Sequence, residues 1–161
     1  SEMVCSGSLK EKAILRIRAP LGTFTLNESN APIILMATGT GFAHMQSLLQ
    51  HLIDTNSKRT VHLYWGARQI DDLYAQQTAH ALIQALPNAR LTLVLSKPHS
   101  EWCGAAGYVQ DHITQDYPDL SAYEVYACGS SDMIESAQIV LHEHCNLPNG
   151  SFFSDAFSPA Q

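Results

Sequence analysis

Two short glycine-bearing turns in this chain could bind a phosphate. The first is Ala37-Thr38-Gly39-Thr40-Gly41, and the second is Ala127-Cys128-Gly129-Ser130-Ser131. Each turn follows a compact apolar run and leads into a segment with helical spacing. Glycine lets backbone N–H groups approach an anion closely, and the helix presents its positive end to that anion. Since open α/β sheets bind ligands where the strand order reverses, two such turns on neighbouring strands predict a dinucleotide diphosphate site.

Neither turn carries a complete nucleotide-binding fingerprint. No third glycine follows Gly41 at the required spacing, and no acidic residue ends the run 61–65 to bind ribose hydroxyls. The Gly-Lys-Ser/Thr ending of a triphosphatase loop is also missing, so no lysine reaches a terminal phosphate. The first turn alone is equally consistent with an ordinary strand-to-helix connection. The presence of the second turn favours phosphate binding.

The remaining reactive side chains allow two interpretations each. Cys128 either places a small, polarisable side chain beside a reactive ring or is a buried small hydrophobe. No histidine stands next to it as a partner base, so the sequence does not indicate covalent chemistry at this thiol. Arg68 could meet a phosphate or ribose, or lie on the surface. His44 and His51 lie about two helical turns apart, which indicates surface or cap groups and no metal site. The aromatic tail 152–157 either caps the core or faces the cofactor of a neighbouring domain, with Asp155 as its ionisable group.

The hydrophobic pattern alternates strands with helices. Continuous apolar runs predict strands, and three- to four-residue spacing predicts helices between them. We expect strands over 32–37, 61–65, 91–95, 123–127 and 151–153, and helices over 42–52, 71–86, 109–115 and 133–144. A further edge strand is expected over 13–18. The alternation predicts a three-layer open α/β fold, in which helices cover both faces of a parallel five-stranded sheet of order 3-2-1-4-5. In that order the two turns lie side by side.

Length, charge and residue composition limit the classes of protein to which this chain can belong. The 161 residues, 45% of them hydrophobic, suffice for one core, and a formal charge of −6 argues against nucleic-acid or anionic-membrane binding. No apolar stretch approaches a membrane span and no signal peptide opens the chain, which predicts a cytoplasmic protein. Four scattered cysteines indicate neither a zinc site nor a disulfide framework. Because Ser1 stands first, the chain is either a processed product or an expressed fragment.

A set of motifs in this order resembles the pyridine-nucleotide domain of the ferredoxin–NADP reductase superfamily. They include Tyr64-Trp65-Gly66-Ala67-Arg68, Asp72-Leu73-Tyr74 and Gly107-Tyr108-Val109, beside the two glycine turns and Phe153-Ser154-Asp155-Ala156-Phe157. The segment from Tyr117 to Gly129 looks most like the CDP-deoxyglucoseen reductases and related flavin reductases. The likeness covers nearly the whole chain. It departs from the family pattern at His44 and at Ser130-Ser131, where prolines are usual.

The resemblance implies a role for each site residue. Thr38, Gly39, Thr40, Gly41 and Gly129 would hold the pyrophosphate, while Cys128 would lie by the nicotinamide and Asp155 and Phe157 would face a flavin. Cys128 and Asp155 are thus the catalytic candidates. The Ser130 and Ser131 hydroxyls would cap the following helix and meet phosphate. Further cofactor-binding candidates are Phe42, Arg68, Ser130 and Met133.

The family pairs this domain with an FAD-binding β-barrel, and hydride passes from NAD(P)H to the flavin. Here residues 1–28 resemble only the last barrel strand and linker, and 29–161 form the NAD(P)H-binding domain. We therefore expect NADH or NADPH as cofactor, FAD only with the missing barrel, and little or no activity of the isolated chain. Partners would be a flavin domain, in a longer parent chain or another protein, and an iron–sulfur module. NADH is slightly favoured, because Lys97 but no arginine follows the third strand. The alternatives are a non-catalytic dinucleotide sensor and a docking subunit without its own flavin domain.

Overall fold

A computed structural model describes residues 12–14, 16 and 22–157, and it is built around a six-stranded sheet. The central strand β1 (Ile33–Thr38) is buried along nearly its whole length, as its unbroken apolar sequence predicts. All strand pairs are parallel, in the order β4-β3-β2-β1-β5-β6. The other strands are β2 (Val61–Ala67), β3 (Ala89–Leu95), β4 (Ala105–Ala106), β5 (Glu124–Ser130) and β6 (Phe152–Phe157).

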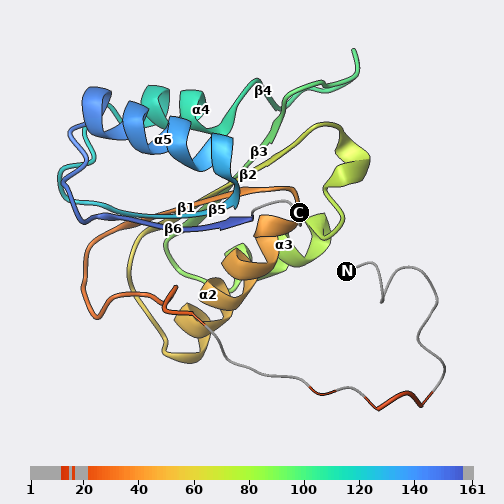
Figure 1. The fold of residues 1–161 in the computed structure, drawn as a ribbon, viewed down its shortest axis with the longest axis horizontal. Coiled ribbons are helices and arrows are strands. Elements are labelled where there is room, and N and C mark those ends of the chain that lie inside the picture. The colour runs from red at the N-terminus through yellow and green to blue at the C-terminus, as the bar shows by residue number, and fades with distance from the viewer. Residues whose placement is uncertain (1–11, 15, 17–21, 158–161) are drawn as a thin grey trace.

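Helices cover both faces of the sheet (Figure 1). α2 (Phe42–Asp54) and α3 (Gln76–Gln84) lie on one face, and α4 (Val109–Asp116) and α5 (Ser131–His144) lie on the other. Alternate residues of β1 point to the two faces, so that Ile33 and Leu35 pack with the α2 side chains while Ile34 and Met36 pack with those of α4 and α5. A short 3-10 helix, η1 (Gly39–Gly41), joins β1 to α2.

The predicted three-layer α/β fold is confirmed, and the five expected strands stand in the expected order. The predicted strand number is wrong by one. β4 adds a sixth strand at the edge beyond β3, and its two alanines carry no strand pattern in the sequence. The strand expected over 13–18 falls on a stretch of which only residues 13, 14 and 16 are described.

The helix predicted over 71–86 begins later than expected. Residues Ile70–Asp72 instead form the 3-10 helix η2, where the Asp72 carboxylate accepts a hydrogen bond from the Gln69 N–H at 3.0 Å. This side-chain bond closes a local turn, so α3 starts only at Gln76. Asp71 and Asp72 therefore do not open α3. Within the described residues, no helix is long and apolar enough to cross a membrane.

Candidate functional site

The two glycine turns touch each other at the carboxyl ends of β1 and β5. A Cβ atom placed on Gly41 would lie only 2.1 Å from the Cys128 carbonyl oxygen, and one on Gly129 would lie 2.2 Å from Thr38 Oγ1. Each turn thus occupies the space that a side chain on the other would need. The predicted juxtaposition of the turns is confirmed, because β1 and β5 are hydrogen-bonded neighbours.

A cavity of about 510 Å³ opens where these turns end. The carboxyl ends of β1, β2, β3 and β5 and the first turns of α4 and α5 contribute to its wall. Its size is within the range typical of cofactor pockets, about 300–1,000 Å³. The lining residues that were predicted to bind cofactor are Thr38, Gly39, Thr40, Arg68, Ser130 and Met133.

The cavity wall combines hydroxyls, helix ends and few charges. Arg68 and Asp72 are its lining ionisable side chains apart from the tyrosines. The 3-10 helix η1, which leads into α2, lines the cavity with Gly39 and Thr40, and the first turn of α2 itself contains no acidic residue. Ser130 caps α5 by accepting a hydrogen bond from the Met133 N–H at 3.4 Å. These features suit an anion such as a diphosphate.

Aromatic packing fixes the first turn. Phe42 stacks on Trp65 with ring centroids 4.2 Å apart, and the Trp65 indole N–H donates to the Gly39 carbonyl at 3.1 Å. Gly39 takes φ +51°, a left-handed conformation that favours glycine, and open space lies where its Cβ would be. The Phe42 and Trp65 side chains therefore hold the turn in place, while Gly39 itself lines the cavity.

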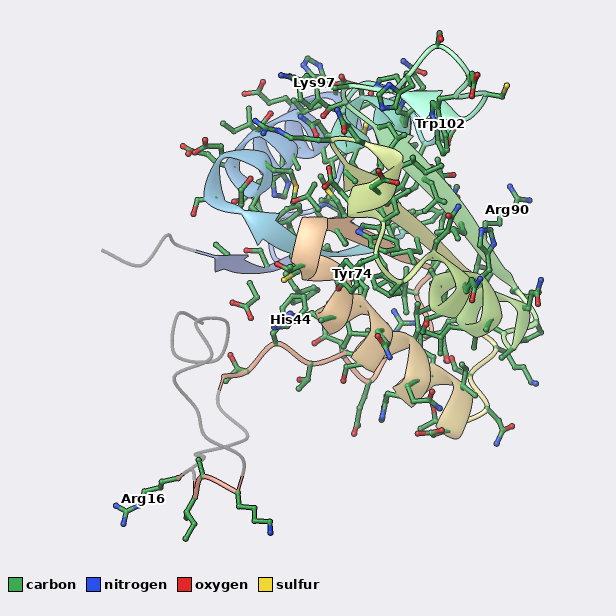
Figure 2. All side chains as sticks on the ribbon, turned by 90° about the vertical axis from the view of Figure 1, so that its right-hand side faces the viewer. Arg16, His44, Tyr74, Arg90, Lys97 and Trp102 are labelled. Atoms are coloured by element: carbon green, nitrogen blue, oxygen red, sulfur yellow. The ribbon has the colours of Figure 1, made fainter. Side chains whose placement is uncertain are left out.

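Several lining residues were assigned no role from the sequence. Tyr74 and Tyr108 line the cavity while 57% and 63% exposed, and Figure 2 shows Tyr74 above α2. The motifs after β2 and before α4 that carried the family resemblance contain these residues, but spacing alone does not say which side chains face a cavity. The remaining lining residues without a predicted role are Gly66, Ala67, Asp72, Val94, Ser96, Gly107, Val109 and Gln110.

Of the two interpretations of Cys128, the structure agrees with the buried small hydrophobe. Cys128 is fully buried and packs in the core on the α2 side of the sheet. Burial, together with the negative charge of Asp155, raises the pKa of the Cys128 thiol to about 12. The neutral thiol behaves as a small hydrophobe, so thiolate chemistry is not available to it.

The other predicted site residues lie behind or beside the cavity. Phe42, Gly41 and Gly129 pack around the interlocked turns and do not line it. Phe157 ends β6, and its side chain is outside the described part of the chain. The cofactor roles of these residues stay predictions.

Asp155 forms a contact that the sequence did not predict. Its carboxylate Oδ2 lies 3.0 Å from Nε2 of His44, at the start of α2. Figure 2 shows His44 beside the segment that leads towards β1. His44 thus contacts a carboxylate and is not only a surface or cap group. Across the described residues, His, Cys, Asp and Glu side chains form no cluster that could hold a metal ion.

The chain matches the family described as "Oxidoreductase NAD-binding domain" over residues 35–138. It belongs to this family of ferredoxin reductase-like domains. It is 42% identical over 153 residues to "CDP-6-deoxy-L-threo-D-glycero-4-hexulose-3-dehydrase reductase" of Yersinia pestis, which covers 95% of this chain and 46% of that protein. It is 32% identical to the "Probable flavin reductase" of Photobacterium leiognathi, over 98% of this chain and 74% of the relative. Among solved structures, the cytochrome P450 reductase GcoB of Amycolatopsis shares the fold with a TM-score of 0.81 at 24% identity, covering 89% of this chain and 44% of that chain.

These likenesses confirm the predicted superfamily and identify the chain as an NAD(P)H-binding reductase domain. The chain spans about half the length of the Yersinia relative. The cavity fits the family's cofactor, because its wall combines the turn residue Gly39, the helix-capping Ser130 and the cationic Arg68, which suit a diphosphate. A nicotinamide dinucleotide is therefore the cofactor of this domain.

Proposed function

We propose that this chain is the NAD(P)H-binding half of a flavin-dependent oxidoreductase, with its flavin held by a separate domain. The observation that carries the proposal is the cavity that opens between two interlocked glycine turns at the carboxyl edge of the sheet. When bound, the dinucleotide supplies a hydride, and the protein contributes binding and orientation.

In this proposal the turn Thr38–Gly41 and the first turn of α2 hold the diphosphate. The Ser130 hydroxyl and Arg68 reach it from the other walls of the cavity. Cys128 closes the core beneath the nicotinamide as a neutral apolar surface, and Asp155, held by His44, faces the flavin. Orientation by fixed groups is the catalytic contribution of the chain itself.

The domain boundary is part of the same proposal. Residues 29–161 form the nucleotide-binding domain, and 1–28 derive from the last strand and linker of a flavin barrel. One relative is named as the ferredoxin–NAD(P)(+) reductase component of dioxygenase systems and another as a dioxygenase electron transfer component, which supports an acceptor such as an iron–sulfur centre. NADH is the favoured nucleotide, since Lys97 follows β3 where a bidentate arginine would grip a 2′-phosphate.

Two serines at the start of α5 give a matched test of the site. Ser130 lines the cavity and caps α5, whereas the next residue, Ser131, does neither. In calorimetric titrations with NADH we expect Ser130→Ala to weaken binding by about tenfold or more, because a hydrogen bond to a charged group contributes about 1.5–3 kcal/mol. Ser131→Ala should bind like wild type. Failure of wild-type protein to bind NADH or NADPH would refute the proposal.

Activity separates the reductase from its non-enzyme alternatives, a dinucleotide sensor or a docking subunit. The purified chain is mixed with NADH, FAD or FMN and an electron acceptor, and the assay is repeated with a flavin-binding domain restored before residue 1. NADH oxidation only by the extended protein would support a reductase half. NADH binding without turnover by either protein would support the sensor.

A further inference from the structure

A buried ion pair lies at the edge of the sheet opposite to the cavity. Arg59 Nη2 is 2.6 Å from Glu124 Oε2, and the two side chains are only 7% and 11% exposed. Glu124 is the first residue of β5 and pairs with Ile33, the first residue of β1. Because the cavity is at the carboxyl ends of these strands, the nucleotide site does not explain this pair. Burying two charges is costly unless hydrogen bonds satisfy both groups.

The segment 22–31, which we call the strap, supplies those hydrogen bonds. Arg59 Nε donates to the Ala31 carbonyl at 2.6 Å, and its Nη1 donates to the Asn27 carbonyl at 3.3 Å. Ser29 Oγ donates to Glu124 Oε1 at 2.8 Å. The ion pair therefore holds the strap at three positions.

Tyr126 ties the strap to the same carboxylate. Its hydroxyl accepts the Asn27 N–H at 3.0 Å and donates to Glu124 Oε2 at 2.9 Å. Burial opposes ionisation of Glu124, but the hydrogen bonds from Arg59, Ser29 and Tyr126 outweigh it and hold the pKa of Glu124 below its usual value. The strap therefore makes its hydrogen bonds to the charged form of the Glu124 carboxylate.

The other end of the strap lies near the His44–Asp155 pair. The Phe24 ring meets Tyr126 edge-on at a centroid distance of 6.0 Å, and meets His44 at 6.1 Å. Gly22 to Thr25 line a second cavity, of about 620 Å³, together with His44, Phe153 and Asp155. The strap therefore crosses from the amino edge of the sheet towards the Asp155 side of β6.

We propose that residues 22–31 are a locked strap that fixes the direction in which the preceding chain leaves this domain, and that Arg59, Glu124 and Tyr126 are the lock. A free linker would let a preceding domain sample many orientations, whereas a strap held at both ends tethers it beside Asp155. The strap thus limits the conformations that must be lost when two domains meet. The inference rests on the proposed preceding domain, whereas the contacts of the strap can be tested without it and without the nucleotide.

Two tyrosines permit a matched test in the whole chain. Tyr126 and Tyr64 are both fully buried, and each donates its hydroxyl to a carboxylate, Glu124 and Asp116 respectively. Only Tyr126 contacts the strap. Hydrogen exchange measured by mass spectrometry should show strap amides exchanging at least about tenfold faster in Tyr126→Phe, and at the wild-type rate in Tyr64→Phe.

Protease cleavage gives a second readout, since Glu28 is an exposed acidic residue within the strap. Cleavage after Glu28 by a glutamate-specific protease should accelerate in Tyr126→Phe and in Ser29→Ala, a variant that spares the buried core. NADH affinity should stay at the wild-type value in both. Equal strap exchange and cleavage in all variants, or equal acceleration in Tyr64→Phe and Tyr126→Phe, would overturn the lock.

Discussion

Replacing Gly41 by alanine adds one methyl group, which should push the two interlocked turns apart. Its backbone is helical, with φ −58° and ψ −19°, so alanine adopts the conformation without strain and gains about 0.4–1 kcal/mol from reduced unfolded-state entropy. Against this gain, the new Cβ would stand 2.1 Å from the Cys128 carbonyl oxygen and 2.7 Å from its carbon. Both are backbone atoms of a central strand, so η1 and β5 must move apart. Overpacking of this kind costs about 1–3 kcal/mol.

We expect Gly41→Ala to lower the free energy of unfolding by about 1–2 kcal/mol. For a domain of this size that is a fall in Tm of about 2–8 °C, measured by circular dichroism. Because the displaced turn lines the cavity, NADH should also bind about tenfold more weakly in calorimetric titrations. Wild-type Tm and wild-type Kd in this variant would show that the turns do not interlock as described.

Gly129→Ala is the matched comparison. A Cβ there meets Thr38 Oγ1 at 2.2 Å and Met133 Cε at 2.6 Å, the ends of two side chains that can rotate away. Stability should therefore fall by less than about 1 kcal/mol, while NADH affinity drops because both displaced groups line the cavity. The bulkier Gly129→Val should weaken binding further. The two glycines are thus distinguished by whether stability and affinity fall together or separately.

Two further predictions follow from buried titratable groups. Because burial and Asp155 raise the pKa of Cys128 to about 12, iodoacetamide at pH 8 should alkylate exposed Cys103 and leave Cys128 unmodified until urea unfolds the chain; native alkylation of Cys128 would contradict its placement. Burial lowers the pKa of His62 from 6.5 to about 4. As the pH falls, His62 is therefore protonated in the unfolded chain before it is protonated in the folded chain, and stability is lost between pH 6.5 and 4. The loss attributable to His62 is roughly 3 kcal/mol, and urea titrations of wild type and His62→Gln should differ in pH dependence by that order.

The central part of the fold was predictable from local pattern. The buried run before Gly39, the glycine turn and the amphipathic helix after it each carry a strong signal, and parallel connection rules then place β1 beside β5. Other features depend on tertiary position. Two alanines form β4 only because β3 offers an edge, and α3 starts late because Asp72 bonds back to Gln69.

The sequence predicted the glycine turns of the candidate site but not the other side chains that line its cavity. Tyr74 and Tyr108 reach the cavity from segments far apart in the sequence, so no spacing rule joins them. The His44–Asp155 and Arg59–Glu124 pairs likewise join residues more than sixty positions apart. Long-range contacts of single side chains have no periodicity, and periodicity is what sequence reasoning uses.

The glycines of the two turns show why such motifs are weak evidence of binding when read alone. Gly41 is required by contacts within the protein itself, since a Cβ there would collide with backbone atoms of the opposite turn, and a Cβ on Gly129 would press on the Thr38 and Met133 side chains. Gly66 follows the same rule, because its Cβ would lie 2.5 Å from Val109 Cγ2. A chain that never met a phosphate would still need glycine at position 41 and would favour it at the other two positions. Gly39 differs, because it lines the cavity, its φ of +51° is set by the turn, and no atom occupies the space where its Cβ would be. The argument for a dinucleotide therefore depends on what the interlocked turns leave open, and not on the number of glycines that they contain.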